Sequence, residues 1–104
     1  MQSHPLVKYQ DKINILAQKH GINYLALFGS YARGEQNQDS DVDLVVQYQK
    51  RVGLFDHAAS QLDIERLLQK PVDLVSLNSL DPMLRHNIMK DFQVIYDQRS
   101  SHLS

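Results

Sequence analysis

The sequence has 104 residues, a length that fits one domain. It carries 11 lysines and arginines against 12 acidic residues, a net charge of −1, so no strong direct nucleic-acid binding is expected. The absence of cysteine rules out disulfides, zinc–cysteine sites and thiol catalysis, and fits a reducing, cytoplasmic compartment. No apolar segment approaches the length of a membrane span, and no signal peptide is expected.

The first half of the chain predicts two helices and two strands. An apolar stripe within residues 5–20 predicts a helix, which Gly21 ends. The segment NYLALFG predicts a strand that ends at Phe28. We expect Ser30 to cap a short helix over the letters YARG. After the polar segment EQNQDS, the letters DVDLVVQY predict a second strand.

The second half repeats the alternation of helix and strand. The apolar residues Leu54, Ala58 and Leu62 begin a pattern that predicts a helix up to Lys70, ended by Pro71. The letters VDLVSL predict a third strand, and SLDPMLRHNIMK predicts a helix in which an aspartate caps and a proline takes the first position. The letters FQVIYD predict the fourth strand.

These elements predict an α/β (α+β) fold, with a mixed β-sheet of about four strands and helices packed on it. The connection between the first two strands is too short for a full crossover helix, so we expect them to be antiparallel neighbours. Residues 1–97 are expected to form the domain, and residues 98–104 a flexible tail.

Two carboxylates at the start of the second strand indicate a cation site. Side chains alternate along a strand, so Asp41 and Asp43 project from one face while Val42 and Leu44 point into the core. Residues 34–49 contain four acids and no lysine or arginine, so no local ion pair relieves the repulsion. A hard divalent ion such as Mg²⁺ would relieve it.

A third acid and a glycine–serine pair extend the candidate site. If the third strand lies beside the second, Asp73 faces the same pocket, and three carboxylates match a two-metal centre for phosphoryl transfer. Asp73 would act as general base or as a ligand of the second ion. Gly29 permits close approach to an anion, and Ser30 offers a hydroxyl to a phosphate. Arg33 could reach a phosphate or brace the acidic loop.

The spacing of these residues resembles a family signature. Gly29-Ser30, ten residues, then Asp41-Val42-Asp43 is similar to the G-S-x10-D-x-D motif of the DNA polymerase β-type nucleotidyltransferases, and residues 28–46 most resemble the minimal nucleotidyltransferases. The resemblance implies a palm-like core and two Mg²⁺ ions on Asp41, Asp43 and Asp73. It also implies ATP as substrate, with its triphosphate at Gly29 and Ser30.

The resemblance also implies a biological role. Many such proteins are antitoxins that transfer AMP to a tyrosine of a cognate HEPN-domain ribonuclease toxin. Two alternatives stay open: a non-catalytic antitoxin that occludes its toxin, and a transferase for a small molecule or an RNA end.

Other polar residues receive simpler interpretations. The five histidines show no metal-binding spacing, and His57 is expected at the surface. The letters QYQKR at 47–51 are interpreted as a solvated strand exit, although Lys50 and Arg51 could steer a triphosphate.

Overall fold

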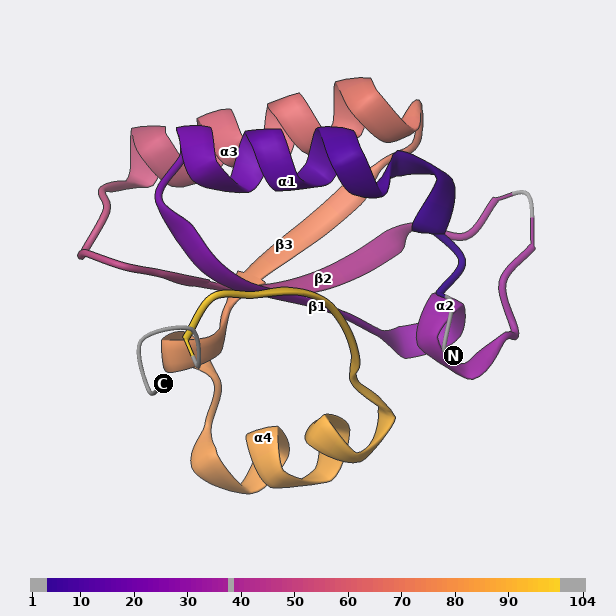
Figure 1. Ribbon diagram of the computed structural model, residues 1–104. Coiled ribbons are helices and arrows are strands. Elements are labelled where there is room, and N and C mark those ends of the chain that lie inside the picture. Colours follow the sequence, from indigo (N-terminus) through magenta and orange to yellow (C-terminus); the bar gives the residue numbers. More distant parts are fainter. Residues whose placement is uncertain (1–3, 38, 100–104) are drawn as a thin grey trace.

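The computed structural model describes residues 4–37 and 39–99 and shows one four-stranded sheet with helices on both faces (Figure 1). The strands stand in the order β3-β2-β1-β4. Strand β2 is antiparallel to β1 and parallel to β3, and β4 is antiparallel to β1. The predicted mixed sheet and the antiparallel pairing of the first two strands are therefore confirmed. The bounds are β1 (Ile22–Phe28), β2 (Val42–Tyr48), β3 (Val72–Ser76) and β4 (Gln93–Asp97).

The helical segments follow the predicted order, with short 3-10 turns added. Within the described residues the α-helices are α1 (Gln10–Lys19), α2 (Gly29–Arg33), α3 (Leu54–Leu68) and α4 (Pro82–Ile88). The 3-10 turns are η1 (Val7–Tyr9), η2 (Leu77–Ser79) and η3 (Met89–Asp91). Figure 1 shows α1 and α3 side by side on one face of the sheet, with α4 on the opposite face. Among the described helices, none is long and apolar enough to cross a membrane.

The main core lies between the sheet and the α1/α3 layer. Ile13 and Ala17 of α1 and Ile64 and Leu68 of α3 are buried in it. The strands contribute a matching set of apolar side chains, among them Leu25, Leu27, Val42, Leu44 and Val46. The alternation predicted for β2 is therefore confirmed, since Val42 and Leu44 are 0% and 1% exposed.

Helix α3 buries a different face from the one whose spacing predicted it. Leu54 is 87% exposed and Leu62 49% exposed, whereas Ser60, Ile64 and Leu68 are buried. The buried residues are four apart and form one helical stripe. Leu54 and Phe55, the apolar pair at the start of α3, therefore face outward.

A second, smaller cluster covers the opposite face of the sheet. It contains Tyr24, Ala26, Val45 and Leu77, with three partly buried residues packed against it, Phe28, Leu80 and Phe92. Because strand side chains alternate, Asp43 shares the face of Val45. The carboxylate thus belongs to the α4 side of the sheet.

Two predicted helix caps have different outcomes. Asp81 caps α4, because its side chain accepts a hydrogen bond from the Met83 N–H at 2.9 Å and Pro82 follows it in the first turn. The Ser30 cap is wrong: α2 begins at Gly29 with Phe28 as the capping residue, so Ser30 lies inside the helix. Gly29, with φ of 72°, lets the chain leave the strand and enter the helix two residues earlier than predicted.

The predicted tail falls mostly outside the described residues. Within the described part, the Gln98 N–H donates to the Asn23 carbonyl at 2.8 Å. The Arg99 guanidinium pairs with Asp97 at 3.1 Å and lies 3.8 Å from the centre of the Tyr24 ring. Residues 100–104 are not described, so the domain boundary at residue 97 stays a prediction.

Candidate functional site

Two of the predicted acids lie side by side on neighbouring strands. The parallel register of β2 and β3 pairs Asp43 with Asp73, and on its other side Asp43 pairs with Phe28 of β1. Neighbouring strands are about 4.8 Å apart, so the two carboxylates and the Phe28 ring form a row across the sheet. This row lies where β1 runs into α2.

Asp41 precedes the strand and is exposed. It nevertheless acts on Asp43, whose pKa is raised above its usual range by burial first, then by the negative charges of Asp73 and Asp41. The positive charge of Arg33 opposes this shift in the pKa of Asp43. The three acids and Arg33 therefore lie in one electrostatic neighbourhood, and an added cation would stabilise the ionised carboxylates.

Gly29 makes the closest approach to this row. A Cβ atom at Gly29 would lie 3.2 Å from Cγ and 3.3 Å from Cβ of Asp43 and would overlap the carboxylate. The glycine is thus required by its φ of 72° and by the space that the Asp43 side chain occupies. The sequence predicts that Gly29 leaves room for a bound anion; in the structure the protein's own Asp43 carboxylate lies against it.

Ser30 and Arg33 occupy the short helix that follows. Within the described residues the Ser30 hydroxyl has no hydrogen-bond partner, so it is available to a ligand. Arg33 Nε pairs with Glu35 Oε1 at 3.0 Å while both side chains are exposed, an arrangement that matches the brace proposed for the acidic loop. An open cavity of about 600 Å³ lies beside Arg33, lined also by His4, Ala32 and residues 90–94.

The carboxylate oxygens of Asp41, Asp43 and Asp73 are chemically suited to a hard cation. Within residues 4–37 and 39–99, no three histidine, aspartate or glutamate side chains are close enough to hold a metal ion between them. Asp41, Asp43 and Asp73 therefore do not form a ready three-ligand metal site in this structure. Carboxylate oxygens are the ligands that Mg²⁺ prefers. Burial first, and then the charges of Asp73 and Asp41, raise the pKa of Asp43, and a cation bound there would oppose that shift.

An aromatic pair beside the acids was not foreseen. The ring centres of Phe28 and Phe92 lie 6.2 Å apart, and Phe28 is the register partner of Asp43. The Gln93 side-chain amide donates to the Ala32 carbonyl at 2.6 Å and so ties β4 to α2. In the sequence, the pair is indicated only by the positions of Phe28 at the end of β1 and of Phe92 just before β4.

The fold and the site together define a class of protein. A small mixed sheet with Asp43 and Asp73 side by side, and with Gly29 against Asp43, agrees with the nucleotidyltransferase signature that the sequence resembles. Residues 10–101 match the family described as "Polymerase beta, Nucleotidyltransferase". The chain therefore belongs to this family, and it is a nucleotidyltransferase.

Similar proteins carry more specific names. A protein of Methanocaldococcus jannaschii, provisionally named a protein adenylyltransferase, is 36% identical over 80 residues, which are 77% of this chain and 86% of that protein. The protein adenylyltransferase MntA of Thermococcus cleftensis is 33% identical over 81 residues, 78% of this chain and 80% of that protein.

Solved structures share the fold. One described as a minimal nucleotidyltransferase is 38% identical, with a TM-score of 0.76 over 85% of this chain and 90% of that chain. A toxin–antitoxin structure with AMP-PNP aligns with a TM-score of 0.74 over 88% of this chain and 76% of that chain; its 23% identity shows the fold alone.

Proposed function

We propose that this chain is a Mg²⁺-dependent protein adenylyltransferase. It would transfer AMP from ATP to a tyrosine hydroxyl of a cognate HEPN-domain toxin and thereby act as its antitoxin in the cytoplasm. The observation that carries the proposal is the pairing of Asp43 with Asp73, beside a glycine that leaves room for the Asp43 carboxylate. Cytoplasmic action agrees with the absence of cysteine.

Related proteins support the choice of substrate. Relatives at 36% and 33% identity bear the name protein adenylyltransferase. One structure of the same fold, 19% identical with a TM-score of 0.67 over 92% of this chain and 76% of that chain, is described as a tri-AMPylated HEPN toxin from Shewanella oneidensis in complex with its MNT antitoxin. The structure with AMP-PNP supports an adenine nucleotide as donor.

The acidic row would hold the metal. Asp41, Asp43 and Asp73 would bind two Mg²⁺ ions, which supply charge neutralisation for the triphosphate and a lowered pKa for the attacking hydroxyl. Gly29 and Ser30 would contact the triphosphate through backbone N–H groups and the free hydroxyl of Ser30. Arg33, which pairs with Glu35 in the structure, would exchange this partner for a phosphate oxygen.

The transfer itself is an in-line substitution at phosphorus. The tyrosine oxygen forms a bond to the α-phosphate, the bond between the α-phosphate and the bridging oxygen breaks, and pyrophosphate leaves. Asp73, which is more exposed than Asp43, would accept the tyrosine proton. The protein contributes mainly position and charge, as phosphoryl chemistry demands.

A labelling experiment tests this function. The chain is incubated with Mg²⁺, ATP labelled at the α-phosphate, and either its HEPN-domain partner or RNA. Label should appear on a tyrosine of the HEPN-domain protein, and Asp41→Asn/Asp43→Asn should abolish it. Label found only on RNA would refute the proposal. If the double variant still neutralises the toxin completely, the chain acts by occlusion and catalysis is dispensable.

A further inference from the structure

A second cavity opens at the opposite end of the sheet from the acidic row. It has a volume of about 710 Å³ and lies where β2 and β3 end. Asp43 and Tyr48 are five residues apart on β2, a span of roughly 17 Å. The wall of this cavity comes from the loop after β2, the first turn of α3 and η2. Its lining residues include Lys50, Arg51, Leu54, Asn78 and Ser79.

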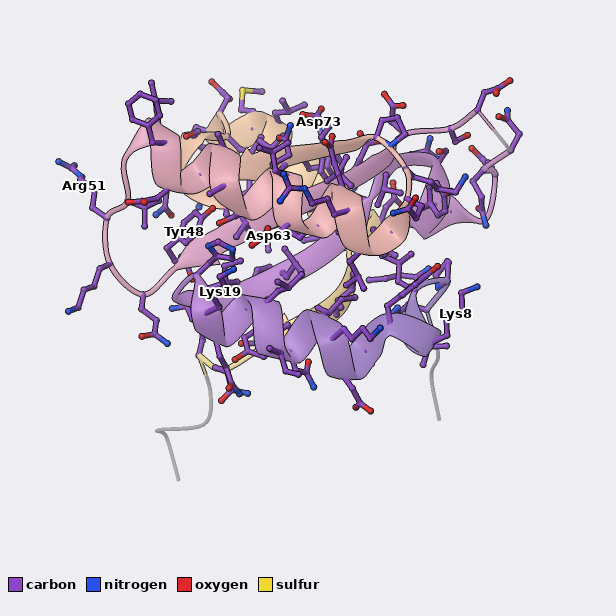
Figure 2. The ribbon with its side chains drawn as sticks, turned by 90° about the horizontal axis from the view of Figure 1, so that it is seen from above. Lys8, Lys19, Tyr48, Arg51, Asp63 and Asp73 are labelled. Atoms are coloured by element: carbon purple, nitrogen blue, oxygen red, sulfur yellow. The ribbon has the colours of Figure 1, made fainter. Side chains whose placement is uncertain are left out.

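Two cations line this cavity without an ionic partner. Lys50 and Arg51 are both exposed, and neither takes part in an ion pair in the described part of the chain. Figure 2 shows Arg51 extending from the loop at one end of the molecule, well away from Asp73. Adjacent unpaired cations attract a negatively charged group.

Two large exposed apolar side chains follow these cations in the chain, at the start of α3, and one of them, Leu54, lines the same cavity. Phe55 is 92% exposed and Leu54 is 87% exposed, although both begin a helix whose later residues are buried. Phenylalanine and arginine are enriched in protein interfaces, where a buried aromatic ring contributes a large contact area. Of the first residues of α3, Leu54 lines the cavity, whereas Phe55 and Asp56 lie outside its lining. The negative charge of Asp56 nevertheless reaches the cavity wall, where it adds to burial in raising the pKa of Tyr48, and the two positive charges of Lys50 and Arg51 oppose it.

Hydrogen bonds hold the wall of the cavity in place. The Tyr48 hydroxyl and His57 Nδ1 are 3.1 Å apart, and His57 Nε2 is 2.8 Å from the Leu74 carbonyl oxygen. His57, predicted as a simple surface residue, therefore links α3 to β2 and β3 and is half-buried. A wall that is already ordered lowers the entropy cost of binding.

We propose that this surface docks an acidic segment of the protein substrate. Carboxylates of the segment pair with Lys50 and Arg51, and a neighbouring apolar side chain packs on Leu54 and Phe55. A free phosphate or nucleotide would use the cations but leave the apolar pair exposed. Docking here holds the substrate while its reactive hydroxyl reaches the acidic row. The proposal rests on the proposed function, which supplies a protein as substrate.

Two variants and two matched controls test the docking surface. Lys50→Glu/Arg51→Glu reverses the charge, and Leu54→Ala/Phe55→Ala removes the apolar pair. All four side chains are exposed or line the cavity, so the fold should persist. The controls are Lys12→Glu and Ile15→Ala on α1, an exposed lysine and an isoleucine that is 65% exposed.

Three readouts separate the docking proposal from the proposed function. Fluorescence anisotropy measures binding of a labelled peptide of glutamates flanking a leucine–phenylalanine pair. In the transfer assay, the KM for the HEPN-domain protein is measured. Calorimetry measures Mg–ATP binding. The two variants should weaken peptide binding and raise the KM for the protein at least tenfold, while Mg–ATP binding and the controls stay at wild-type values.

Each outcome has a distinct meaning. Peptide binding that is absent in the wild type, or equal in the wild type and Lys50→Glu/Arg51→Glu, overturns the docking proposal. Tighter binding of an RNA oligonucleotide at the same residues overturns it as well. Failure of Mg–ATP binding with intact, variant-sensitive peptide binding refutes the proposed function and leaves an acidic protein as the ligand of this surface.

Discussion

Substitution of Gly29 by alanine should damage both the fold and the site. The left-handed backbone at Gly29, with φ of 72°, costs about 1–2 kcal/mol for a residue with a Cβ. The new Cβ overlaps the Asp43 carboxylate, which must leave its rotamer at a cost of about 1 kcal/mol. The variant should lose about 2–3 kcal/mol of unfolding free energy and bind Mg–ATP more weakly, since Asp43 is displaced.

Gly34 supplies a matched control for this prediction. Its φ is also 72°, but a Cβ there has nothing within 4 Å. Gly34→Ala should therefore lose only the backbone contribution, about 1–2 kcal/mol, and keep its affinity for Mg–ATP. Urea unfolding measures the first quantity and calorimetry the second. Equal unfolding free energies and equal nucleotide affinities for the two variants would contradict this prediction.

Three further substitutions test other contacts. Asp63→Ala removes the contacts to His20 at 2.7 Å and Lys19 at 3.2 Å and should cost about 1 kcal/mol near pH 6. The hydrogen bond to His20, followed by the one to Lys19, lowers the pKa of Asp63 in the folded protein. The ionised carboxylate therefore stabilises the fold above the ordinary aspartate pKa near 4, and this stabilisation is lost as pH falls through the lowered pKa of the folded state. If Asp63→Ala costs the same unfolding free energy at pH 6 and at pH 2 in urea titrations, the prediction is contradicted. Asp81→Ala removes the cap of α4 and should cost about 1 kcal/mol, with faster amide exchange in α4 and unchanged exchange in α1. Asp43→Asn should raise the urea midpoint slightly at pH 7. Burial and neighbouring acids raise the pKa of Asp43, so its negative charge is unfavourable in the folded protein, although solvent screening keeps the gain in unfolding free energy to about a fraction of a kcal/mol. A lower midpoint for this variant would contradict the prediction.

The strand pairing was predictable because local chemistry restricts it. The connection between Phe28 and Val42 contains only a one-turn helix and a polar loop, so the two strands had to be antiparallel neighbours. A long connection carrying α3 separates β2 from β3, which permits the parallel pair. The alternation around Asp43 then placed that acid away from the main core.

The finer features of the site were not predictable from spacing alone. Helix α2 starts two residues before the predicted position because Gly29 adopts a positive φ, and nothing in the letters GSYARG distinguishes that geometry from a serine cap. The contact between Gly29 and Asp43 depends on the register of β1 and β2. The exposure of Leu54 and Phe55 depends on which side of α3 meets the sheet.

Calorimetric titration measures whether Mg–ATP binds at the acidic row. We propose that ATP and its metal ions bind at Asp41, Asp43 and Asp73, against Gly29 and Ser30 at the start of α2. Wild-type protein should bind ATP only when Mg²⁺ is present, and Asp43→Asn and Asp73→Asn should each abolish that metal-dependent binding. Undiminished Mg–ATP affinity in the variants, with folds intact, would contradict the account.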